Sequence, residues 1–271
     1  MTDVLVLRQL DRGVLTLTLN RPERNNGWTL ELEEAYFDAL AAAAADAEVR
    51  AIVLTGAGRA FCPGLDVQAL SASTEGIRVG VRPRRPMTFA LSIPKPVIAA
   101  INGACAGIGF IQASCADLRF GARGAKLTTA FARRGLPAEN SLAWLLPRLI
   151  GHANAADLLL SARTIHADEA KQLGFLHRVT EPPELLPTVL AYAHDLADNV
   201  SPIAMATIKA QLWGDWGRSQ EESRRFALGR VADLSDNHPD FKEGVRSFVE
   251  KRPPAFPGLS VEIEVEREIA R

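Results

Sequence analysis

The chain has 271 residues, of which 47% are hydrophobic, so it can bury the core of one α/β domain with an appendage or of two small domains. Its 31 lysines and arginines nearly balance its 32 aspartates and glutamates, which argues against nucleic acid or an acidic membrane surface as a partner. The apolar runs fall short of the roughly 20 residues that span a bilayer, and the N-terminus lacks a secretory pattern, so a cytoplasmic protein is expected.

The first elements are predicted from hydrophobic periodicity. Alternating leucines and threonines over residues 15–19 predict a half-buried strand, which the turn at Asn20-Arg21-Pro22 ends. A helix is predicted next, with Thr29 as its N-cap and acidic residues in its first turn. Its apolar face carries Leu32, Tyr36, Leu40 and Ala43.

Two short, continuous apolar runs at residues 51–55 and 97–101 predict strands that are covered on both faces. A glycine-bearing segment follows each of them, at residues 60–66 and 102–109. Strands that alternate with helices and crossover connections predict an α/β fold. Each glycine segment can point a backbone N–H into a common site, and two such donors would make an oxyanion hole.

The periodicity is lost over residues 71–86, where arginines and prolines predict either a solvated basic loop or a lid beside a ligand. After about Thr180 the strand signal ends. Four amphipathic helices are predicted at residues 185–199, 203–213, 219–234 and 239–251. The charged, alternating residues 261–271 predict a loosely held tail.

Several common chemistries find little support in the sequence. Three cysteines without C-x-x-C spacing argue against a disulfide framework or a zinc site, so we expect no bound metal. We interpret them as small buried residues, with a nucleophilic Cys62 as the alternative. The two G-x-G pairs, which begin at Gly56 and Gly107, lack the third glycine of a dinucleotide fingerprint, and no phosphate loop is present.

A series of motifs resembles the crotonase superfamily, the enoyl-CoA hydratases and isomerases, from about Val14 to Phe256. Each motif is weak alone, but their order and spacing are specific. The motifs are Leu19-Asn20-Arg21-Pro22-Glu23, Thr55-Gly56-Ala57-Gly58-Arg59-Ala60-Phe61-Cys62 with Gly64 and Asp66, Pro94-Lys95-Pro96 through Asn102-Gly103, Gly135-Leu136-Pro137, Leu146-Pro147-Arg148-Leu149-Ile150-Gly151 and Phe248-Val249-Glu250-Lys251-Arg252-Pro253. The resemblance implies a crotonase (ClpP-like) fold of repeated ββα units with a C-terminal helical region.

The resemblance also implies a CoA-thioester site in which two backbone N–H groups bind the thioester oxygen while an enolate develops. The matching donors here are the amides of Leu65, after Gly64, and Ile108, after Gly107. Fixed amide donors suit this task because they need no reorganisation as the charge forms. Ile108 also lies at a predicted helix start, where the dipole favours an anion.

CoA contacts are implied along the same segments, and CoA would be part of the substrate rather than a permanently bound cofactor. The loop with Arg24, Asn25 and Asn26 matches the segment that wraps the adenine and pantetheine, and residues 60–65 continue that surface. The positions implied to contact CoA are Arg24, Asn25, Asn26, Ala60, Phe61, Gly64, Asp66, Gly107, Phe248 and Lys251. We expect Asp66 mainly to brace its glycine turn, and Phe248 and Lys251 to reach a CoA held by a neighbouring subunit.

The acids depart from the hydratase pattern. Hydratases of the superfamily use two glutamates to hold and activate water, and these positions carry Ile111 and Ala130, which transfer no proton. One carboxylate remains, because Glu139 matches the position of a catalytic Glu or Asp in certain enoyl-CoA and dienoyl-CoA isomerases. A single carboxylate can move a proton from one carbon to another, although an acid at the start of a helix over residues 140–149 would also suit the dipole.

The best-supported function is therefore isomerisation of an enoyl-CoA double bond, with Leu65 and Ile108 as oxyanion donors and Glu139 as the proton shuttle. The alternatives are a hydratase with an atypical acid or base, and a non-catalytic protein of the same fold that binds acyl-CoA. The resemblance further implies a homotrimer or a hexamer. Residues 1–200 would form the core domain, and residues 201–271 a helical trimerisation region with its tail.

Overall fold

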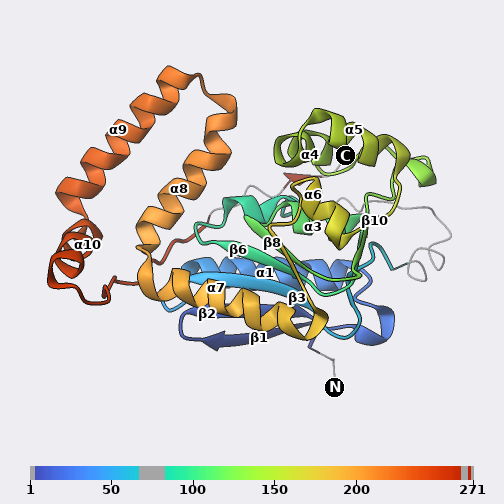
Figure 1. Cartoon of the computed structure of the whole chain (residues 1–271), viewed down its shortest axis with the longest axis horizontal. Helices are drawn as coiled ribbons and strands as arrows, with labels where there is room; N and C mark the ends of the chain where they lie inside the picture. Colours follow the sequence, from blue (N-terminus) through green and yellow to red (C-terminus); the bar gives the residue numbers. More distant parts are fainter. Residues whose placement is uncertain (1–3, 67–82, 264–267, 270–271) are drawn as a thin grey trace.

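Two β-sheets organise the molecule, as the computed structural model in Figure 1 shows, and the structure describes residues 4–66, 83–263 and 268–269. The larger sheet has the strand order β1-β2-β3-β6-β8-β11, with an antiparallel β1–β2 hairpin and parallel pairs elsewhere. Its strands are β1 (Val6–Asp11), β2 (Val14–Leu19), β3 (Ala51–Gly56), β6 (Val97–Ile101), β8 (Leu118–Ala122) and β11 (Arg178–Thr180).

The smaller sheet has the order β10-β9-β7-β4, in which β9, β7 and β4 are parallel. Its strands are β4 (Ala60–Cys62), β7 (Ala104–Ala106), β9 (Lys126–Thr128) and β10 (Ile165–His166). The chain enters the two sheets alternately, since β3, β6 and β8 lie in the larger sheet and the strand after each of them lies in the smaller one. This is the repeated unit that the sequence predicted.

The helices are interspersed with the strands along the chain. They are α1 (Leu30–Ala45), α3 (Ile108–Ser114), α4 (Leu142–Ile150), α5 (His152–Ser161), α6 (Ala167–Gln172), α7 (Leu185–Asn199), α8 (Pro202–Gly214), α9 (Gln220–Asn237) and α10 (Pro239–Glu250). The short 3₁₀ turns are η1 (Pro22–Arg24), η2 (Phe89–Ser92), η3 (Ala132–Arg134), η4 (Pro182–Glu184) and η5 (Asp215–Gly217).

Helices cover both faces of the larger sheet, as its apolar strands predicted. On β3, Ile52 and Leu54 join the core that includes α1, whereas Ala51 and Val53 pack with α7. The Thr29 side chain caps α1 by accepting a hydrogen bond from the Leu32 amide. The predicted apolar face of this helix is fully buried.

A buried ion pair fastens α8 to the core. The Lys209 Nζ lies 2.7 Å from an Asp117 carboxylate oxygen and also donates to the carbonyls of Ala90 and Lys95, each at 3.1 Å. The same carboxylate accepts hydrogen bonds from the backbone of Val97 and the indole of Trp213. These contacts give Asp117 a structural role. Lys209 ties α8 to η2.

Replacing Lys209 with methionine should lower the free energy of unfolding by about 3–5 kcal/mol, because it leaves the carboxylate of Asp117 without its buried partner. Denaturant unfolding measures this loss. Lys171→Met, at an exposed position of α6, is the matched control and should change stability by less than about 0.5 kcal/mol. Equal effects of the two substitutions would contradict the role of the ion pair.

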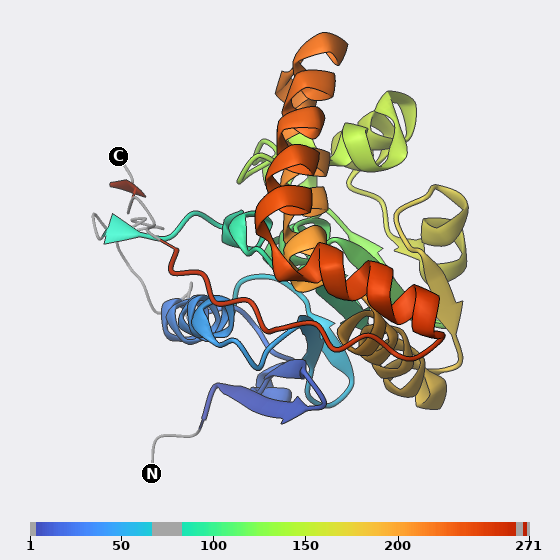
Figure 2. The same ribbon diagram turned by 90° about the vertical axis from the view of Figure 1, so that its left-hand side faces the viewer.

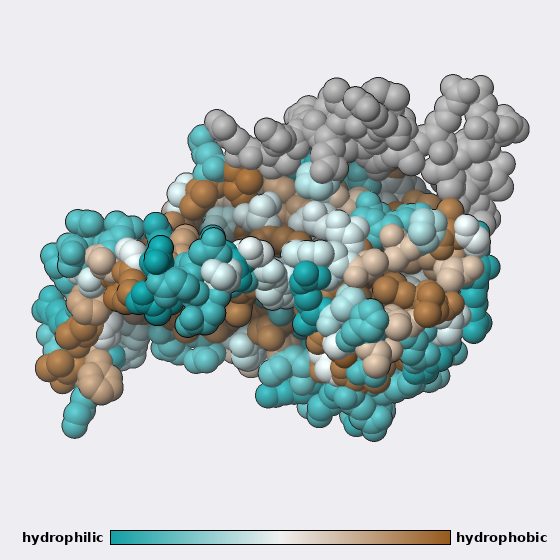
Figure 3. Space-filling view, turned by 90° about the horizontal axis from the view of Figure 1, so that it is seen from above, coloured by the Kyte–Doolittle hydropathy of each residue, from teal (hydrophilic) through white to brown (hydrophobic). Residues whose placement is uncertain are grey.

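Helices α8, α9 and α10 extend to one side of the sheets (Figures 1 and 2). The boundary predicted at residues 200 and 201 falls in the turn between α7 and α8, and the division into two domains stays a prediction. Apolar residues are exposed along all three helices, and Figure 3 shows such residues at this end of the molecule. They include Ile208, Leu212, Leu228, Val231, Phe241, Val245, Phe248 and Val249.

The prediction of a loosely held tail is wrong for its described residues. The Val261 amide donates to the carbonyl of Ala44 at the end of α1, and Ile263 packs against the main core. Glu268–Ile269 (β12) pairs with Pro83–Arg84 (β5). A strand therefore follows Thr180, after which the sequence predicted only helices and the tail. Residues 71–82 of the predicted basic loop or lid lie outside the described residues.

Candidate active site

Two glycine turns meet at the carboxyl ends of strands β4 and β7 in the smaller sheet. Strands β4 and β7 are parallel neighbours, with Cys62 opposite Cys105, so the turns that follow them lie side by side. Gly64 has a φ of +107° and Gly107 a φ of +51°, which favour glycine. A Cβ atom on Gly107 would lie only 3.7 Å from the Gly64 Cα, and one on Gly64 would lie 3.3 Å from the Ala106 carbonyl oxygen.

The amide of Leu65 follows the first turn. Leu65 pairs with Trp28 in a parallel bridge, in which the Trp28 amide donates to the Gly64 carbonyl and the Asp66 amide donates to the Trp28 carbonyl. Because hydrogen bonds in such a bridge come from the residues on either side of Leu65, its own N–H points away from Trp28. Among the described residues, no backbone acceptor is found for this N–H.

The amide of Ile108 follows the second turn. Ile108 is the first residue of α3, so its N–H has no acceptor within the helix. Gly107, the N-cap, supplies no side chain, and no backbone acceptor for the Ile108 amide is found in the part of the chain that the structure describes. Both turns therefore offer a fixed donor at the same edge of the sheet.

The side chain of Asp66, two residues after Gly64, links the first turn to the loop that carries Arg21 and Arg24. Its carboxylate lies 3.0 Å from an Arg21 nitrogen and 2.8 Å from an Arg24 nitrogen, and Asp66 is buried. The hydrogen bond to this carboxylate raises the pKa of Arg24. The predicted bracing role of Asp66 agrees with these contacts.

The asparagines of the same loop bind protein groups. Asn26 is fully buried, and its Nδ2 donates to the carbonyls of Ala57 and Ala60 at 2.9 and 2.8 Å. The Asn25 Oδ1 accepts from Arg59 Nε at 2.8 Å. Ala60 and Phe61 are buried in β4. The side chains of the predicted CoA loop thus hold the loop against β4.

Glu139 lies in the segment before α4 and is half-buried, and this burial raises the pKa of its carboxyl. The helix begins at Leu142 rather than at Asn140 as predicted, because Asn140 and Ser141 adopt left-handed conformations with φ of +50° and +61°. Glu139 therefore precedes the helix, and stabilisation by the dipole explains its identity less well. Two consecutive left-handed residues other than glycine are strained, as is common at functional sites.

The two hydratase positions carry no acid. Ile111 is fully buried on α3, within the main core. Ala130 follows β9 and has a φ of +66°. A glutamate at that position would have to adopt the same unfavourable backbone conformation.

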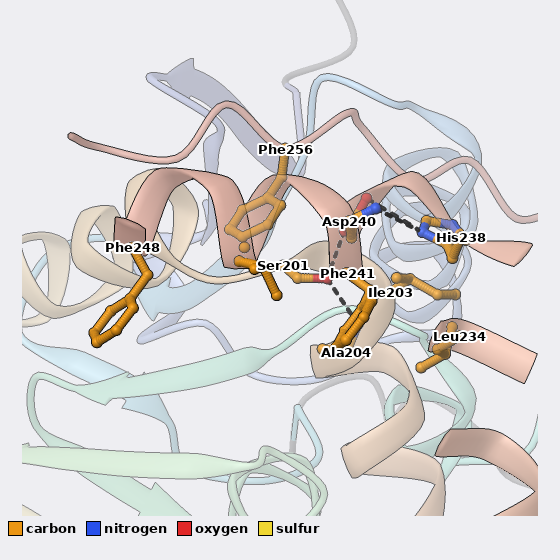
Figure 4. A pocket seen from close by; sticks show the side chains of 11 residues that line it. Ser201, Ile203, Ala204, Leu234, His238, Asp240, Phe241, Phe248 and Phe256 are labelled. Atoms are coloured by element: carbon orange, nitrogen blue, oxygen red, sulfur yellow. Dashed lines mark hydrogen bonds and ion pairs between the residues drawn. The ribbon is translucent and has the colours of Figure 1, made fainter. Parts of the chain in front are cut away.

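The structure does not bring Phe248 and Lys251 to the glycine turns of the same chain, since α10 lies apart from α3 (Figure 1). The Phe248 side chain is 85% exposed, and Lys251 ends α10 in a left-handed conformation. Phe248 lies at one end of an apolar cavity of about 590 Å³ between α8, α9 and α10, and Figure 4 shows Phe256 and Phe241 in the same cavity.

The alternative of a nucleophilic Cys62 finds no support. All three cysteines are buried, and burial raises the pKa of the Cys62 thiol to about 12, which keeps it protonated at neutral pH. Within the described ranges, no group of three or more His, Cys, Asp or Glu residues is arranged to hold a metal ion.

Sequence reasoning missed a hollow that is lined in part by two residues soon after Glu139 in the chain. Thr88, Leu91, Ser141 and Trp144 line it, and their sequence positions gave no common motif. The only signal available was a tryptophan soon after Glu139, and one aromatic residue on an apolar helix ordinarily indicates core packing.

Comparison with known proteins shows the family and the fold. Residues 9–259 match the family model of enoyl-CoA hydratase/isomerase. The chain therefore belongs to the enoyl-CoA hydratase/isomerase family, and the predicted resemblance is confirmed. Members of this family act on acyl-CoA substrates, so the chain is an acyl-CoA enzyme.

Two curated relatives cover nearly the whole chain. The 1,2-epoxyphenylacetyl-CoA isomerase of Escherichia coli is 34% identical over 93% of this chain and 98% of its own length. A probable enoyl-CoA hydratase of Rhodobacter capsulatus is 36% identical over 92% of this chain and 96% of its own.

Solved structures show the same fold. A probable enoyl-CoA hydratase/isomerase of Mycobacterium abscessus is 33% identical with a TM-score of 0.86, covering 93% of this chain and 98% of that one. An enoyl-CoA hydratase of Bacillus anthracis is 29% identical with a TM-score of 0.88, covering 94% and 99%. The predicted crotonase fold is confirmed. None of the described helices combines the length and apolar character needed to cross a membrane.

Proposed function

We propose that the protein isomerises the double bond of an enoyl-CoA. The observation that carries this proposal is the meeting of two glycine turns, each followed by an amide with no backbone acceptor among the described residues, at one edge of the smaller sheet. Two fixed donors of this kind stabilise the negative oxygen of a thioester enolate. The amides of Leu65 and Ile108 are the proposed donors.

Glu139 is the proposed proton shuttle. In a 3-enoyl-CoA, its carboxylate would take the proton from C2, and the electron pair would move onto the thioester oxygen. Glu139 would then return the proton to C4, which leaves the double bond between C2 and C3. Burial raises the pKa of the Glu139 carboxyl because it disfavours the charged form. A carboxylate with a raised pKa is a stronger base, which supports this role. No resident cofactor takes part.

The second candidate is hydration of a 2-enoyl-CoA with Glu139 and a differently placed water. The hydratase names of several relatives favour it, whereas the apolar residues at Ile111 and Ala130 and the isomerase name of the Escherichia coli relative favour isomerisation. Assays with 3-enoyl-CoA and 2-enoyl-CoA substrates separate the two. Conversion of 3-enoyl-CoA to 2-enoyl-CoA supports the proposal, and accumulation of a 3-hydroxyacyl-CoA from 2-enoyl-CoA would favour hydration.

The proposed CoA site includes the loop with Arg24, Asn25 and Asn26 in one subunit and Phe248 with Lys251 from its neighbour. The separation of α10 from the glycine turns within one chain supports a contribution from a second subunit.

The protein should form a trimer or a hexamer in solution. The exposed apolar faces of α8, α9 and α10 are better covered by further copies of the chain than by water. Light scattering after size-exclusion chromatography should give three or six times the mass of one chain. A monomer at micromolar concentration would contradict this prediction.

A further inference from the structure

A hollow of about 410 Å³ lies between η2 and the start of α4. Thr88 and Leu91 line it on one side, and Ser141 and Trp144 line it on the other. This volume falls within the range of about 300–1,000 Å³ that is typical of small-molecule sites. One tryptophan and one leucine supply apolar surface, and two hydroxyl-bearing side chains supply polar groups.

One wall of the hollow belongs to the same short segment as the proposed proton shuttle. Ser141 lies two residues after Glu139, and the Leu142 amide donates to the Glu139 carbonyl at 2.9 Å, which folds the intervening residues into a tight turn. The Trp144 amide donates to the Ser141 carbonyl at 2.9 Å. Trp144 is thus fixed within one helical turn of the segment that carries Glu139.

The indole of Trp144 is held by its neighbours but keeps a free surface. The guanidinium of Arg148 lies 4.3 Å from the centre of the indole, and Arg148 Nη1 also donates to the Trp144 carbonyl. Trp216 contacts the indole edge to face, with 4.9 Å between the ring centres. Trp144 nevertheless remains 42% exposed. Its ring is therefore oriented in advance, and part of it is available to a ligand.

The opposite wall of the hollow is also fixed. The Gln112 Nε2 donates to the carbonyl of Met87, directly before Thr88, and the Lys209 Nζ donates to the carbonyl of Ala90, directly before Leu91. Gln112 and Lys209 are both buried. Because one wall is anchored to the core and the Trp144 ring is held by Arg148 and Trp216, the hollow can discriminate between groups of different shape.

We propose that this hollow receives the acyl group of the substrate and that Trp144 makes it prefer an aromatic ring to a saturated one. This inference rests on the proposed function, in which Glu139 acts on an acyl-CoA. A cavity of about 150 Å³ suffices for benzene, so the hollow has room for a ring and its linker. Aromatic rings gain energy from edge-to-face or offset contacts beyond the area that they bury.

Binding of two non-reactive esters tests this inference without turnover. Isothermal titration calorimetry would compare 3-phenylpropanoyl-CoA with 3-cyclohexylpropanoyl-CoA, which have the same number of carbons. The protein should bind the phenyl ester more tightly, by on the order of 5-fold. Trp144→Leu should bring the ratio of the two Kd values to about 1, and Trp144→Phe should keep most of it. Leu160→Ala, at an exposed position of α5, should leave the ratio unchanged.

Equal Kd values for the two esters, or a phenyl preference that survives in Trp144→Leu, would overturn the inference. A phenyl preference in a protein that fails to isomerise any 3-enoyl-CoA would refute the proposed reaction but would support the proposed ring selectivity of the hollow. Failure to bind either ester would refute both.

Discussion

Replacing either Gly64 or Gly107 with alanine should lower kcat/KM for a 3-enoyl-CoA by about 10²–10³-fold, the usual loss when one oxyanion donor is removed. Alanine rarely adopts the φ of +107° at Gly64 or +51° at Gly107, so the backbone must shift. The amides of Leu65 and Ile108 immediately follow and would move with it. Steady-state kinetics with each purified variant measures the loss.

Gly124→Ala is the matched control for backbone strain. Gly124 also has a positive φ, +84°, but a Cβ there would meet no atom within 4 Å, and the residue lies in the turn between β8 and β9. It should lose some stability and keep its activity. If all three variants lose activity in proportion to their loss of stability, the glycine turns have a structural role only.

Glu139→Gln should lower kcat by about 10²–10⁴-fold, because glutamine keeps the shape of the side chain and cannot accept the proton. The Kd for a non-reactive acyl-CoA should change by less than about 2-fold, since the proposed contacts with CoA come from other residues. Glu184→Gln, at an exposed position before α7, serves as the control. Full activity of Glu139→Gln would contradict the role of Glu139 as the proton shuttle.

The pH dependence follows from the raised pKa of Glu139. The shuttle starts from the carboxylate, so kcat/KM should fall as the pH drops through the pKa of Glu139, at a value above the ordinary 4.5. The same shift affects stability with the opposite sense: a raised pKa in the folded state means that the contribution of this group to stability is present at low pH and declines as the pH rises through that pKa. Glu139→Gln should therefore be at least as stable as the parent at pH 7, which circular dichroism during heating would show.

Most of the core could be predicted from the sequence because its patterns are local. The leucine and threonine alternation gave β2, the continuous apolar runs gave β3 and β6, and Thr29 with its apolar stripe gave α1. The smaller sheet was harder to find. Its strands, such as Ala60–Cys62 and Ala104–Ala106, have two or three residues each, too few to show a period.

Backbone conformation accounts for the errors near Glu139. The amino acid pattern allowed a helix from Asn140, but two left-handed residues delay its start to Leu142, and no single residue type signals this. The described residues of the tail were mispredicted because a charged, alternating composition does not reveal the backbone hydrogen bond from Val261 to α1.

The site could be predicted only as far as the family motifs reach. They identified the two glycine turns, and the structure shows that these turns meet because β4 and β7 are parallel neighbours. They could not identify Trp144, since the hollow combines residues in or next to η2 and α4 that lie fifty or more positions apart in the sequence.

The most direct test of enolate formation is to incubate a 3-enoyl-CoA with the enzyme in deuterium oxide and to follow the products by mass spectrometry. If Leu65 and Ile108 stabilise an enolate and Glu139 carries the proton from C2 to C4, the product is a 2-enoyl-CoA that has gained no water and that mostly keeps the transferred proton instead of taking up deuterium, and Glu139→Gln forms almost none of it. A hydrated product as the main species, or an unchanged rate in Glu139→Gln, would contradict the proposed mechanism.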